Sequence, residues 1–231
     1  MKIALLGYGK MGKTIERIAE ERGHEIILKI TDNAATQDLS RADIAIDFSV
    51  PQAAFTNITS CFEKGIPVVS GTTGWLEKYE EAAESCRRNN SGFIYASNFS
   101  LGVNIFFELN KKLAEMMVNF PQYTPSIEEI HHTQKLDSPS GTAITLAQQI
   151  IEKTSKTSWT LEKPAEGELP ITAKREENVP GTHLVTYSSA IDTINIEHIA
   201  HSRDGFALGA VIAAEWLKDK RGVFSMKDVL F

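Results

Sequence analysis

Short apolar runs alternate with longer amphipathic stretches in the first part of the chain. The apolar runs have the length of β-strands and occupy residues 3–6, 26–30, 44–46, 66–69 and 93–95. Between these runs, apolar residues recur at helical spacing in residues 11–19, 51–64 and 75–88. Strands that alternate with helices in this way predict right-handed crossovers and a parallel sheet covered on both faces, which is an α/β fold.

The pattern changes after Leu101. An apolar helix is followed by the run Ser126–His131, by a helix that starts at Thr142, and by a stretch of proline, glutamate and lysine over residues 162–169. Two alternating runs, 184–188 and 191–199, predict a hairpin in an antiparallel sheet with one exposed face. Helical spacing returns at 206–217, and the tail 223–230 is expected to pack back onto the first unit. We therefore predict a second, α+β domain inserted into the α/β domain.

Composition and charge narrow the classes of partner. The 231 residues are 42% hydrophobic and 23% charged, which is typical of a globular protein. Lys and Arg total 24 against 30 Asp and Glu, so a net charge of -6 disfavours nucleic acids and anionic membrane surfaces. The first residues are too short an apolar run for a signal peptide, and we expect a cytoplasmic protein. Cys61 and Cys86 lack a metal-binding or redox spacing and are interpreted as small buried hydrophobes.

A glycine fingerprint directly follows the first predicted strand. Gly7, Gly9 and Gly12 stand in the G-x-G-x-x-G spacing, where glycine lets the chain turn, approach a pyrophosphate and pack a helix on a strand. Asp32 ends the next strand, where a carboxylate can accept both ribose hydroxyls. This pattern predicts dinucleotide binding rather than a plain turn. No Arg follows Asp32, which favours NADH over NADPH, although Lys29 and Arg41 could weaken that preference.

Two further polar segments lie at the ends of later strands. Gly71–Gly74 and Ala96–Phe99 follow predicted strands, and ligands of open α/β sheets bind beyond such carboxyl ends. We expect both segments to flank the nicotinamide. Taken singly, each could instead be a turn with helix-capping side chains.

The densest polar cluster covers residues 128–143. His131 or His132 can serve as a general acid near neutral pH, and Lys135 can neutralise a carboxylate or deliver a proton. Ser140, Gly141 and Thr142 precede a helix, so backbone N–H groups there could bind a carboxylate, unless they form only a helix cap. The cluster predicts a small anionic substrate.

Two other kinds of site are disfavoured. His131 and His132 are adjacent, so on a strand they point to opposite faces, and no cysteine cluster or H-E-x-x-H motif completes a metal site. We expect no metal. A Ser-His-Asp hydrolase would need a G-x-S-x-G elbow, which is missing, and would leave the glycine fingerprint unexplained.

Taken together, these residues resemble the dihydrodipicolinate (4-hydroxy-tetrahydrodipicolinate) reductase family. The resemblance spans nearly the whole chain, and its most specific string is H-H-x-x-K-x-D-x-P-S-G-T-A at residues 131–143. The other matching strings are the glycine fingerprint, I-D-F-S-x-P at 46–51, G-T-T-G at 71–74, and N-F-S-x-G-V-N at 98–104.

The resemblance implies a fold, an assembly and a reaction. It implies a Rossmann-type domain of residues 1–99 and 205–231 and an inserted substrate-binding and tetramerisation domain of residues 100–204. The chain would form a homotetramer and reduce a cyclic imine dicarboxylate of lysine and diaminopimelate biosynthesis with NADH or NADPH.

The resemblance also implies roles for single residues. His131 would donate and accept the proton, and Lys135 would assist. Substrate carboxylates would be bound by His132, Ser140, Gly141 and Thr142. The cofactor would be held by Gly7, Tyr8, Gly9, Lys10, Met11, Gly12, Asp32, Phe48, Gly71, Thr72, Thr73, Ala96, Ser97, Asn98 and Phe99.

The chain departs from the family pattern in three places. Thr133-Gln134 replaces a basic residue that many members carry, Asp32 lacks a following Arg, and the stretch between Lys153 and Val179 is compact. Arg203 would serve as a hinge or a cofactor contact. The rival functions are a different two-domain nicotinamide oxidoreductase, such as an amino-acid dehydrogenase or imine reductase, and an NADH-binding redox sensor without turnover.

Overall fold

A computed structural model describes residues 1–31, 34 and 37–231, which form two compact units. The first unit contains residues 1–101 and 204–231, and the second contains residues 102–203. Asp32, which the sequence predicts to contact the ribose, lies outside the described residues.

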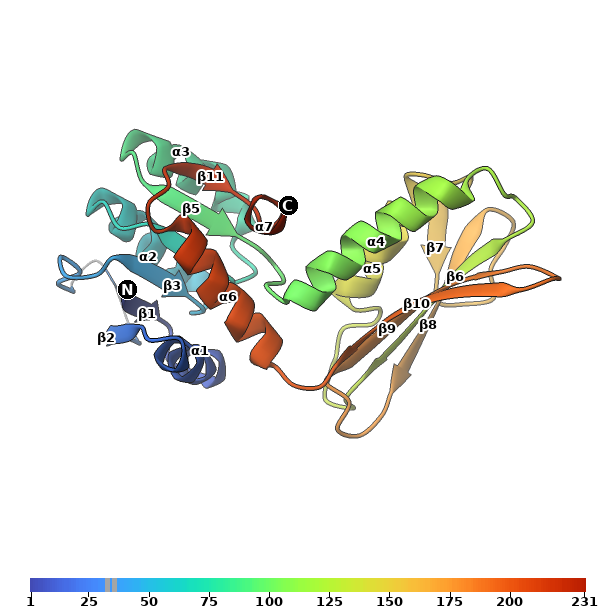
Figure 1. The fold of residues 1–231 in the computed structure, drawn as a ribbon, viewed down its shortest axis with the longest axis horizontal. Helices are drawn as coiled ribbons and strands as arrows, with labels where there is room; N and C mark the ends of the chain where they lie inside the picture. The colour runs from blue at the N-terminus through green and yellow to red at the C-terminus, as the bar shows by residue number, and fades with distance from the viewer. Residues whose placement is uncertain (32–33, 35–36) are drawn as a thin grey trace. The chain divides into compact units, whose positions relative to one another are not determined.

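The first unit is built on a parallel sheet with the order β11-β5-β4-β3-β1-β2 (Figure 1). Its strands are β1 (Lys2–Leu6), β2 (Glu25–Ile30), β3 (Ile44–Asp47), β4 (Val68–Ser70), β5 (Gly92–Tyr95) and β11 (Gly222–Phe224). The connecting helices are α1 (Lys10–Glu21), α2 (Pro51–Glu63), α3 (Tyr79–Arg88), α6 (Asp204–Leu217) and α7 (Met226–Leu230). The strand order reverses between β1 and β3, and this switch point is where open α/β sheets bind ligands.

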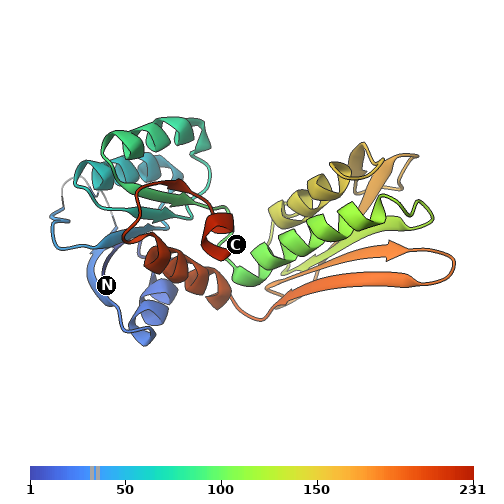
Figure 2. The ribbon, with the colours of Figure 1, turned by 45° about the horizontal axis from the view of Figure 1, so that its top comes forward.

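Alternation along each strand fills a core on both faces of this sheet. In β1, Ile3 and Leu5 face one core while Ala4 and Leu6 face the other, because successive side chains point to opposite faces. Helices α1 and α6 cover the first face, and α2 and α3 cover the second (Figures 1 and 2). The predicted Rossmann-type α/β fold is confirmed. The tail joins it through β11, which pairs with β5, and through Met226, which is buried in the first core.

The second unit is a mixed sheet with helices on one face. The sheet has the order β10-β9-β6-β8-β7, and its strands are β6 (Thr124–His131), β7 (Ser158–Thr160), β8 (Glu168–Arg175), β9 (Gly181–Ser188) and β10 (Thr193–Ala200). Helices α4 (Leu101–Met117) and α5 (Gly141–Ile151) pack on the sheet (Figure 2). The expected hairpin is present as antiparallel β9 and β10. The hairpin was expected in an antiparallel sheet, but the sheet is mixed, because β8 runs parallel to β6 and to β7.

Other expectations concern cysteines and membranes. Cys61 and Cys86 are free and buried, and burial raises the pKa of their thiols to about 12 and about 11. Both therefore stay protonated at neutral pH, as expected for small core residues. Among the described residues, no helix combines the length and the apolar character needed to cross a membrane.

Candidate active site

The glycine turn after β1 packs tightly at two positions and is open at the third. Gly7 has φ of +92°, and a Cβ there would lie 2.2 Å from the carbonyl oxygen of Phe48. A Cβ at Gly12 would lie 2.4 Å from the carbonyl oxygen of Gly7. Gly9 is exposed, and a Cβ there would meet no atom within 4 Å. The first and third glycines therefore allow the turn to form, and the second leaves room for a ligand to approach the backbone.

Helix α1 starts at this turn without a capping side chain. Gly9 is its N-cap, no side-chain hydrogen bond caps it, and the first turn contains no acidic residue. The first N–H groups of a helix have no intrahelical partner, and they carry a partial positive charge. The turn and helix start thus fit the pyrophosphate of a dinucleotide.

A buried carboxylate ties the ends of β3 and β4 together. Asp47 is fully buried, and its carboxylate accepts hydrogen bonds from the hydroxyls of Ser49 at 2.6 Å and Ser70 at 2.8 Å. The amide of Ser49 in turn donates to Oγ1 of Thr72 at 2.9 Å. Burial raises the pKa of Asp47. This network fixes the loop that carries Phe48 beside the loop of residues 71–73.

The ends of β4 and β5 complete this edge of the sheet. A Cβ at Gly71 would lie 2.3 Å from the ring of Phe48, and the rings of Phe48 and Phe99 lie 5.8 Å apart. The amide of Ser100 donates to Oδ1 of Asn98 at 2.9 Å. The segments 7–12, 71–73 and 96–99 all follow carboxyl ends of parallel strands, as their sequence positions predict.

In the second unit, one face of the sheet changes from apolar to polar along the strands. Alternate residues of β6, β8 and β9 point toward α4 and α5, and Ile127, Ile171 and Val185 form the apolar part of this face. Further along, the same face carries Glu129 and His131 from β6, His183 from β9 and Arg175 from β8. Because the strand pairs place Glu129 opposite His183, and His131 opposite Arg175, the four side chains meet.

His131 lies against the carboxylate of Glu129. Its Nδ1 atom is buried and lies 3.0 Å from Oε2 of Glu129, which is itself fully buried. The centroids of the His131 and His183 rings lie 5.0 Å apart, and the rings meet in an edge-to-face arrangement. On the neighbouring strand β9, a Cβ at Gly181 would approach Nε2 of His131 to 3.1 Å. The imidazole is thus enclosed by a carboxylate, a second imidazole and a glycine.

Arg175 uses all five of its N–H groups in this cluster. Nη1 and Nη2 both donate to Oε1 of Glu129 at 3.1 Å. The remaining donors contact backbone carbonyl oxygens, namely those of Lys135 at 3.3 Å, Asp137 at 2.7 Å and Lys174 at 2.7 Å. The guanidinium therefore holds both the buried carboxylate and the loop that follows His131.

These contacts set the charges of the cluster. Burial alone would raise the pKa of Glu129, but its contacts with His131, the amide of Ser140 and Arg175 outweigh burial and lower it to about 2. Burial, and then the electrostatic interaction with His131, lower the pKa of His183 to about 3. At neutral pH the cluster therefore contains a charged Glu129 and a neutral His183.

The start of α5 is joined to the same cluster. Ser140 caps the helix by accepting a hydrogen bond from the amide of Ala143 at 3.2 Å, and its hydroxyl lies 3.0 Å from Nε2 of His183. The amide of Ser140 donates to Oε2 of Glu129 at 3.2 Å. Gly141 is exposed, and a Cβ there would meet nothing within 4 Å. The helix start can therefore accept an anion at its surface.

Lys135 is held by a neighbouring carboxylate. Its ammonium donates to both oxygens of Asp137, at 2.8 and 2.7 Å. This contact, more than any other, lowers the pKa of Asp137. The side chain of Asp137 is 61% exposed, so an arriving carboxylate can replace it on the ammonium.

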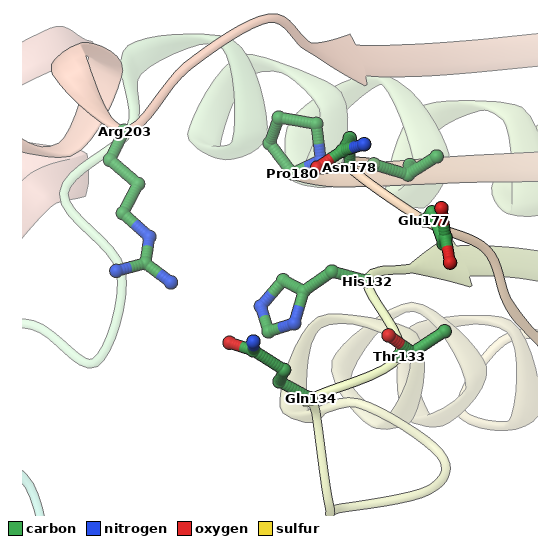
Figure 3. A pocket seen from close by; sticks show the side chains of 8 residues that line it. His132, Thr133, Gln134, Glu177, Asn178, Pro180 and Arg203 are labelled. Atoms are coloured by element: carbon green, nitrogen blue, oxygen red, sulfur yellow. The ribbon is translucent and has the colours of Figure 1, made fainter.

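A cavity of about 450 Å³ lies beside His132, the residue that follows His131 in the chain (Figure 3). The side chains of His132, Gln134 and Arg203 point into one space (Figure 3). Nδ1 of His132 is buried and has no hydrogen-bond partner. The remaining lining residues are Thr133, Glu177, Asn178, Val179 and Pro180. Among the predicted substrate residues, only His132 lines this cavity.

Comparison with known proteins matches both units. The family model described as dihydrodipicolinate reductase, N-terminus, matches residues 1–99, and the corresponding C-terminus model matches residues 102–230. The chain belongs to the dihydrodipicolinate reductase family.

Relatives of this family match the chain over nearly its full length. A 4-hydroxy-tetrahydrodipicolinate reductase of Christiangramia forsetii is 65% identical, with 100% of this chain and 98% of that protein covered. The enzyme of the same name from Methanosarcina barkeri is 33% identical, with 96% and 82% covered. A solved dihydrodipicolinate reductase of Paenisporosarcina sp. TG-14, bound to dipicolinate, has the same fold, with a TM-score of 0.79, 22% identity and 97% of each chain covered.

In this dihydrodipicolinate reductase family member, sequence reasoning missed Glu129, Arg175 and His183. All three could have been found from alternation, because they share the inward face with Ile127, Ile171 and Val185 at even spacing along their strands. Residues 162–169 are rich in Pro, Glu and Lys, a composition typical of a loop, so β8 was not predicted from the sequence. Arg175, the last residue of β8, was missed for the same reason.

One group in the described part of the chain has the composition of a metal site. Ligand atoms of Glu129, His131 and His183 lie within 4.8 Å of one another. The sequence prediction of no metal considered only His131 and His132 and did not foresee this group. Glu129 is already bound by a guanidinium, and His183 by Ser140. A metal cation bound here would be repelled by the positive charge of Arg175 unless it displaced the guanidinium. This set of side chains therefore favours a hydrogen-bonded network that exchanges protons over a metal site.

Proposed function

We propose that this protein reduces (2S,4S)-4-hydroxy-2,3,4,5-tetrahydrodipicolinate to tetrahydrodipicolinate in lysine and diaminopimelate biosynthesis, as its family name implies. The observation that carries the proposal is the imidazole of His131, held against the buried carboxylate of Glu129, 3.0 Å away, beside a capped but anion-accessible helix start. Such an arrangement supports proton transfer to a bound carboxylate substrate.

Residues 1–99 and 205–231 are proposed to bind the pyridine nucleotide. The open position at Gly9 and the uncapped start of α1 support binding of the pyrophosphate. Within the proposed contact set, the segments 71–73 and 96–99 would flank the nicotinamide. When bound, the reduced nicotinamide supplies a hydride to C4 of the substrate ring.

NADH is the proposed preference. Asp32 stands at the end of the second strand without a following Arg, and a carboxylate repels the 2′-phosphate of NADPH. Lys29, which could weaken this preference, is paired with Glu16, and its ammonium lies 4.8 Å from the ring centre of Tyr8. The ratio of kcat/KM for NADH and NADPH tests this preference, and Asp32→Ala should shift the ratio toward NADPH.

Residues 100–204 are proposed to bind the substrate. The solved relative binds dipicolinate, a planar cyclic dicarboxylate, and the same chemistry would suit the amides of Gly141 and Thr142. Lys135 would exchange Asp137 for one substrate carboxylate, and His132 would contact the substrate from the wall of the cavity. His131, assisted by Lys135, would supply the proton that balances the hydride after the ring has lost its hydroxyl as water.

A homotetramer is also proposed, formed through the open face of the second sheet. Alternate residues of β6 and β9 on this face are half-buried, and Ile199 of β10, which pairs with Thr182 of β9, is exposed by 50%. A sheet with one uncovered face of this composition can bury it against a copy of itself. Sedimentation velocity on the purified protein tests the assembly. The free, buried cysteines suit a reducing compartment, so we place the enzyme in the cytoplasm.

The deciding experiment measures NADH and NADPH oxidation by the purified protein. The substrate is generated in place from pyruvate and aspartate semialdehyde by the preceding synthase. Turnover that requires the synthase and is lost in His131→Gln supports the proposal. Binding of NADH without turnover would instead favour a sensor, and turnover only with other imines or amino acids would favour a different oxidoreductase.

A further inference from the structure

We propose that Arg175 and Glu129 form a positioning pair that aligns the proton donor, the lysine loop and the anion-binding helix start with one another. The inference rests on the proposed function. It adds to it two residues that are not among the proposed catalytic or substrate-binding residues. The pair joins three consecutive segments of the chain, namely the end of β6, the loop of residues 132–139 and the start of α5, to Arg175 on β8.

Arg175 is a scaffold rather than a substrate contact. A guanidinium has five N–H donors, and here all five are used within the protein. Two of them hold the peptide carbonyls of Lys135 and Asp137, at 3.3 and 2.7 Å. The position of the loop that carries the ammonium of Lys135 is therefore set by the same group that binds Glu129.

The two carboxylate oxygens of Glu129 contact different partners. Oε1 accepts both hydrogen bonds from Arg175. Oε2 accepts the amide of Ser140 at 3.2 Å and lies 3.0 Å from Nδ1 of His131. Because a carboxylate is planar and rigid, the angle at which Arg175 holds Oε1 also determines where Oε2 meets the imidazole and the helix cap. A carboxylate against Nδ1 leaves Nε2 of His131 for exchange with the substrate.

The cost of burying this ion pair supports a functional role. Glu129 is fully buried, and the side chain of Arg175 is 22% exposed. Buried pairs commonly contribute little net stability compared with apolar residues of similar size. A nearby pair on the same strands, formed by the side chains of Glu128 and Lys174 at 2.7 Å, lies on the opposite face of the sheet and is partly exposed. It offers a matched control.

The experiment compares Arg175→Gln, Arg175→Lys and Glu129→Gln with the control Lys174→Gln in steady-state kinetics. We expect Arg175→Gln and Glu129→Gln to lower kcat about 10- to 100-fold and to raise KM for the substrate, because misplacement of reacting groups by about 1 Å costs this much. Arg175→Lys keeps the charge but has three donors on one atom, so it should recover only part of kcat. Lys174→Gln should stay within about twofold of wild type.

Two further measurements separate positioning from folding. NADH binding, followed by its fluorescence, should be unchanged in all variants because the dinucleotide site lies in the other unit. The double variant Glu129→Gln/Arg175→Gln removes both charges together, so it should fold even where a single variant does not, and its kcat should remain low. Binding of dipicolinate as a probe should weaken in the double variant if the helix start has moved.

The outcomes are distinguishable. Folded Arg175 or double variants with wild-type kcat and KM overturn the positioning role while the proposed function stands. Full recovery of kcat by Arg175→Lys also overturns it, because charge alone would then suffice. A wild-type protein without turnover overturns the proposed function, and the positioning role with it.

Discussion

The candidate site of the first unit consists mainly of backbone groups, whereas that of the second unit consists mainly of side chains. In the first unit, the site is made of backbone, since glycines at 7, 9 and 12 and an uncapped helix start present amides to a ligand. In the second unit, the site is made of buried side chains, in which Glu129 contacts both His131 and Arg175 directly. Amides suffice to hold phosphates whose charge does not change. A proton transfer needs a titratable group in a fixed environment.

The two units also treat a buried carboxylate in opposite ways. Asp47 in the first unit receives hydroxyl hydrogen bonds from Ser49 and Ser70, and burial still raises its pKa. Glu129 in the second unit is as deeply buried, yet its pKa is lowered to about 2 because charged and amide donors outweigh burial. The partner, rather than the depth of burial, decides in which direction the pKa of such a group is shifted.

The largest expected effect is on the proton donor. His131→Gln should lower kcat by about 10²- to 10⁴-fold with little change in KM, since general acid catalysis contributes about this much. Lys135→Ala should both raise KM and lower kcat, each by about 10-fold, because it removes a charge-assisted contact with a carboxylate. Steady-state kinetics with each substrate varied in turn measures both. NADH binding should be unaffected, and a double variant with unchanged rates would contradict the assignment.

The next largest effects are expected from alanine substitutions at two glycines of the turn that follows β1. Gly7→Ala should lower the free energy of unfolding by about 3 kcal/mol, because its Cβ would lie 2.2 Å from a carbonyl oxygen. Gly9→Ala should change stability by less than about 1 kcal/mol, because its Cβ meets nothing, yet weaken NADH binding about 10-fold. Denaturant unfolding and fluorescence titration separate the two. Equal NADH affinity in Gly9→Ala and wild type would show that no ligand approaches this backbone.

A smaller effect is expected on the stability of the second unit at acidic pH. The pKa of His183 falls from an ordinary 6.5 to about 3, so the unfolded chain binds this proton first, and stability is lost as pH falls from 6.5 toward 3. Glu129, with a pKa lowered from 4.5 to about 2, adds a loss over that lower range. Asp47 has a raised pKa, so its contribution has the opposite sign, and acid relieves the cost of its buried charge. The second unit should therefore lose stability first on acidification.

Hydrogen exchange measures this difference strand by strand. Protection of β6, β8 and β9 should fall between pH 6.5 and 4.5, by about 2 kcal/mol, while that of β1, β3 and β4 changes less. His183→Gln keeps a polar side chain that does not titrate, and it should flatten this pH dependence. A variant that remains as sensitive to acid as wild type would assign the loss to other groups.

The smallest expected effect comes from the glycine beside the imidazole. Gly181→Ala would place a Cβ 3.1 Å from Nε2 of His131 on a backbone with φ of +159°, so the ring must move by a few tenths of an ångström and the backbone must adjust. We expect kcat to fall by about threefold with normal NADH binding. Thr182→Ala, on the opposite face of the same strand, is the control and should leave kcat unchanged. Equal rates in both variants would mean that the ring tolerates displacement.

Much of the first unit could be predicted because its signals are local. The G-x-G-x-x-G spacing and each apolar run lie within a few residues, and the strand ends that follow them occupy one edge of the sheet by topology alone. The second unit was predicted less well. Its mixed sheet depends on β8, whose sequence begins in a stretch of proline and glutamate that has the composition of a loop.

The sequence by itself determined the α/β alternation, the glycine turn and the His131 to Thr142 string, because each depends on residue types at fixed short spacings. Only the tertiary structure decided which carboxylate and which guanidinium surround His131. Arg175 is 44 positions away along the chain and meets His131 through the register of β6 with β8, and His183 meets Glu129 through the register of β6 with β9. Strand register is a property of the whole packed sheet, since a shift of one residue would turn every one of these side chains to the other face.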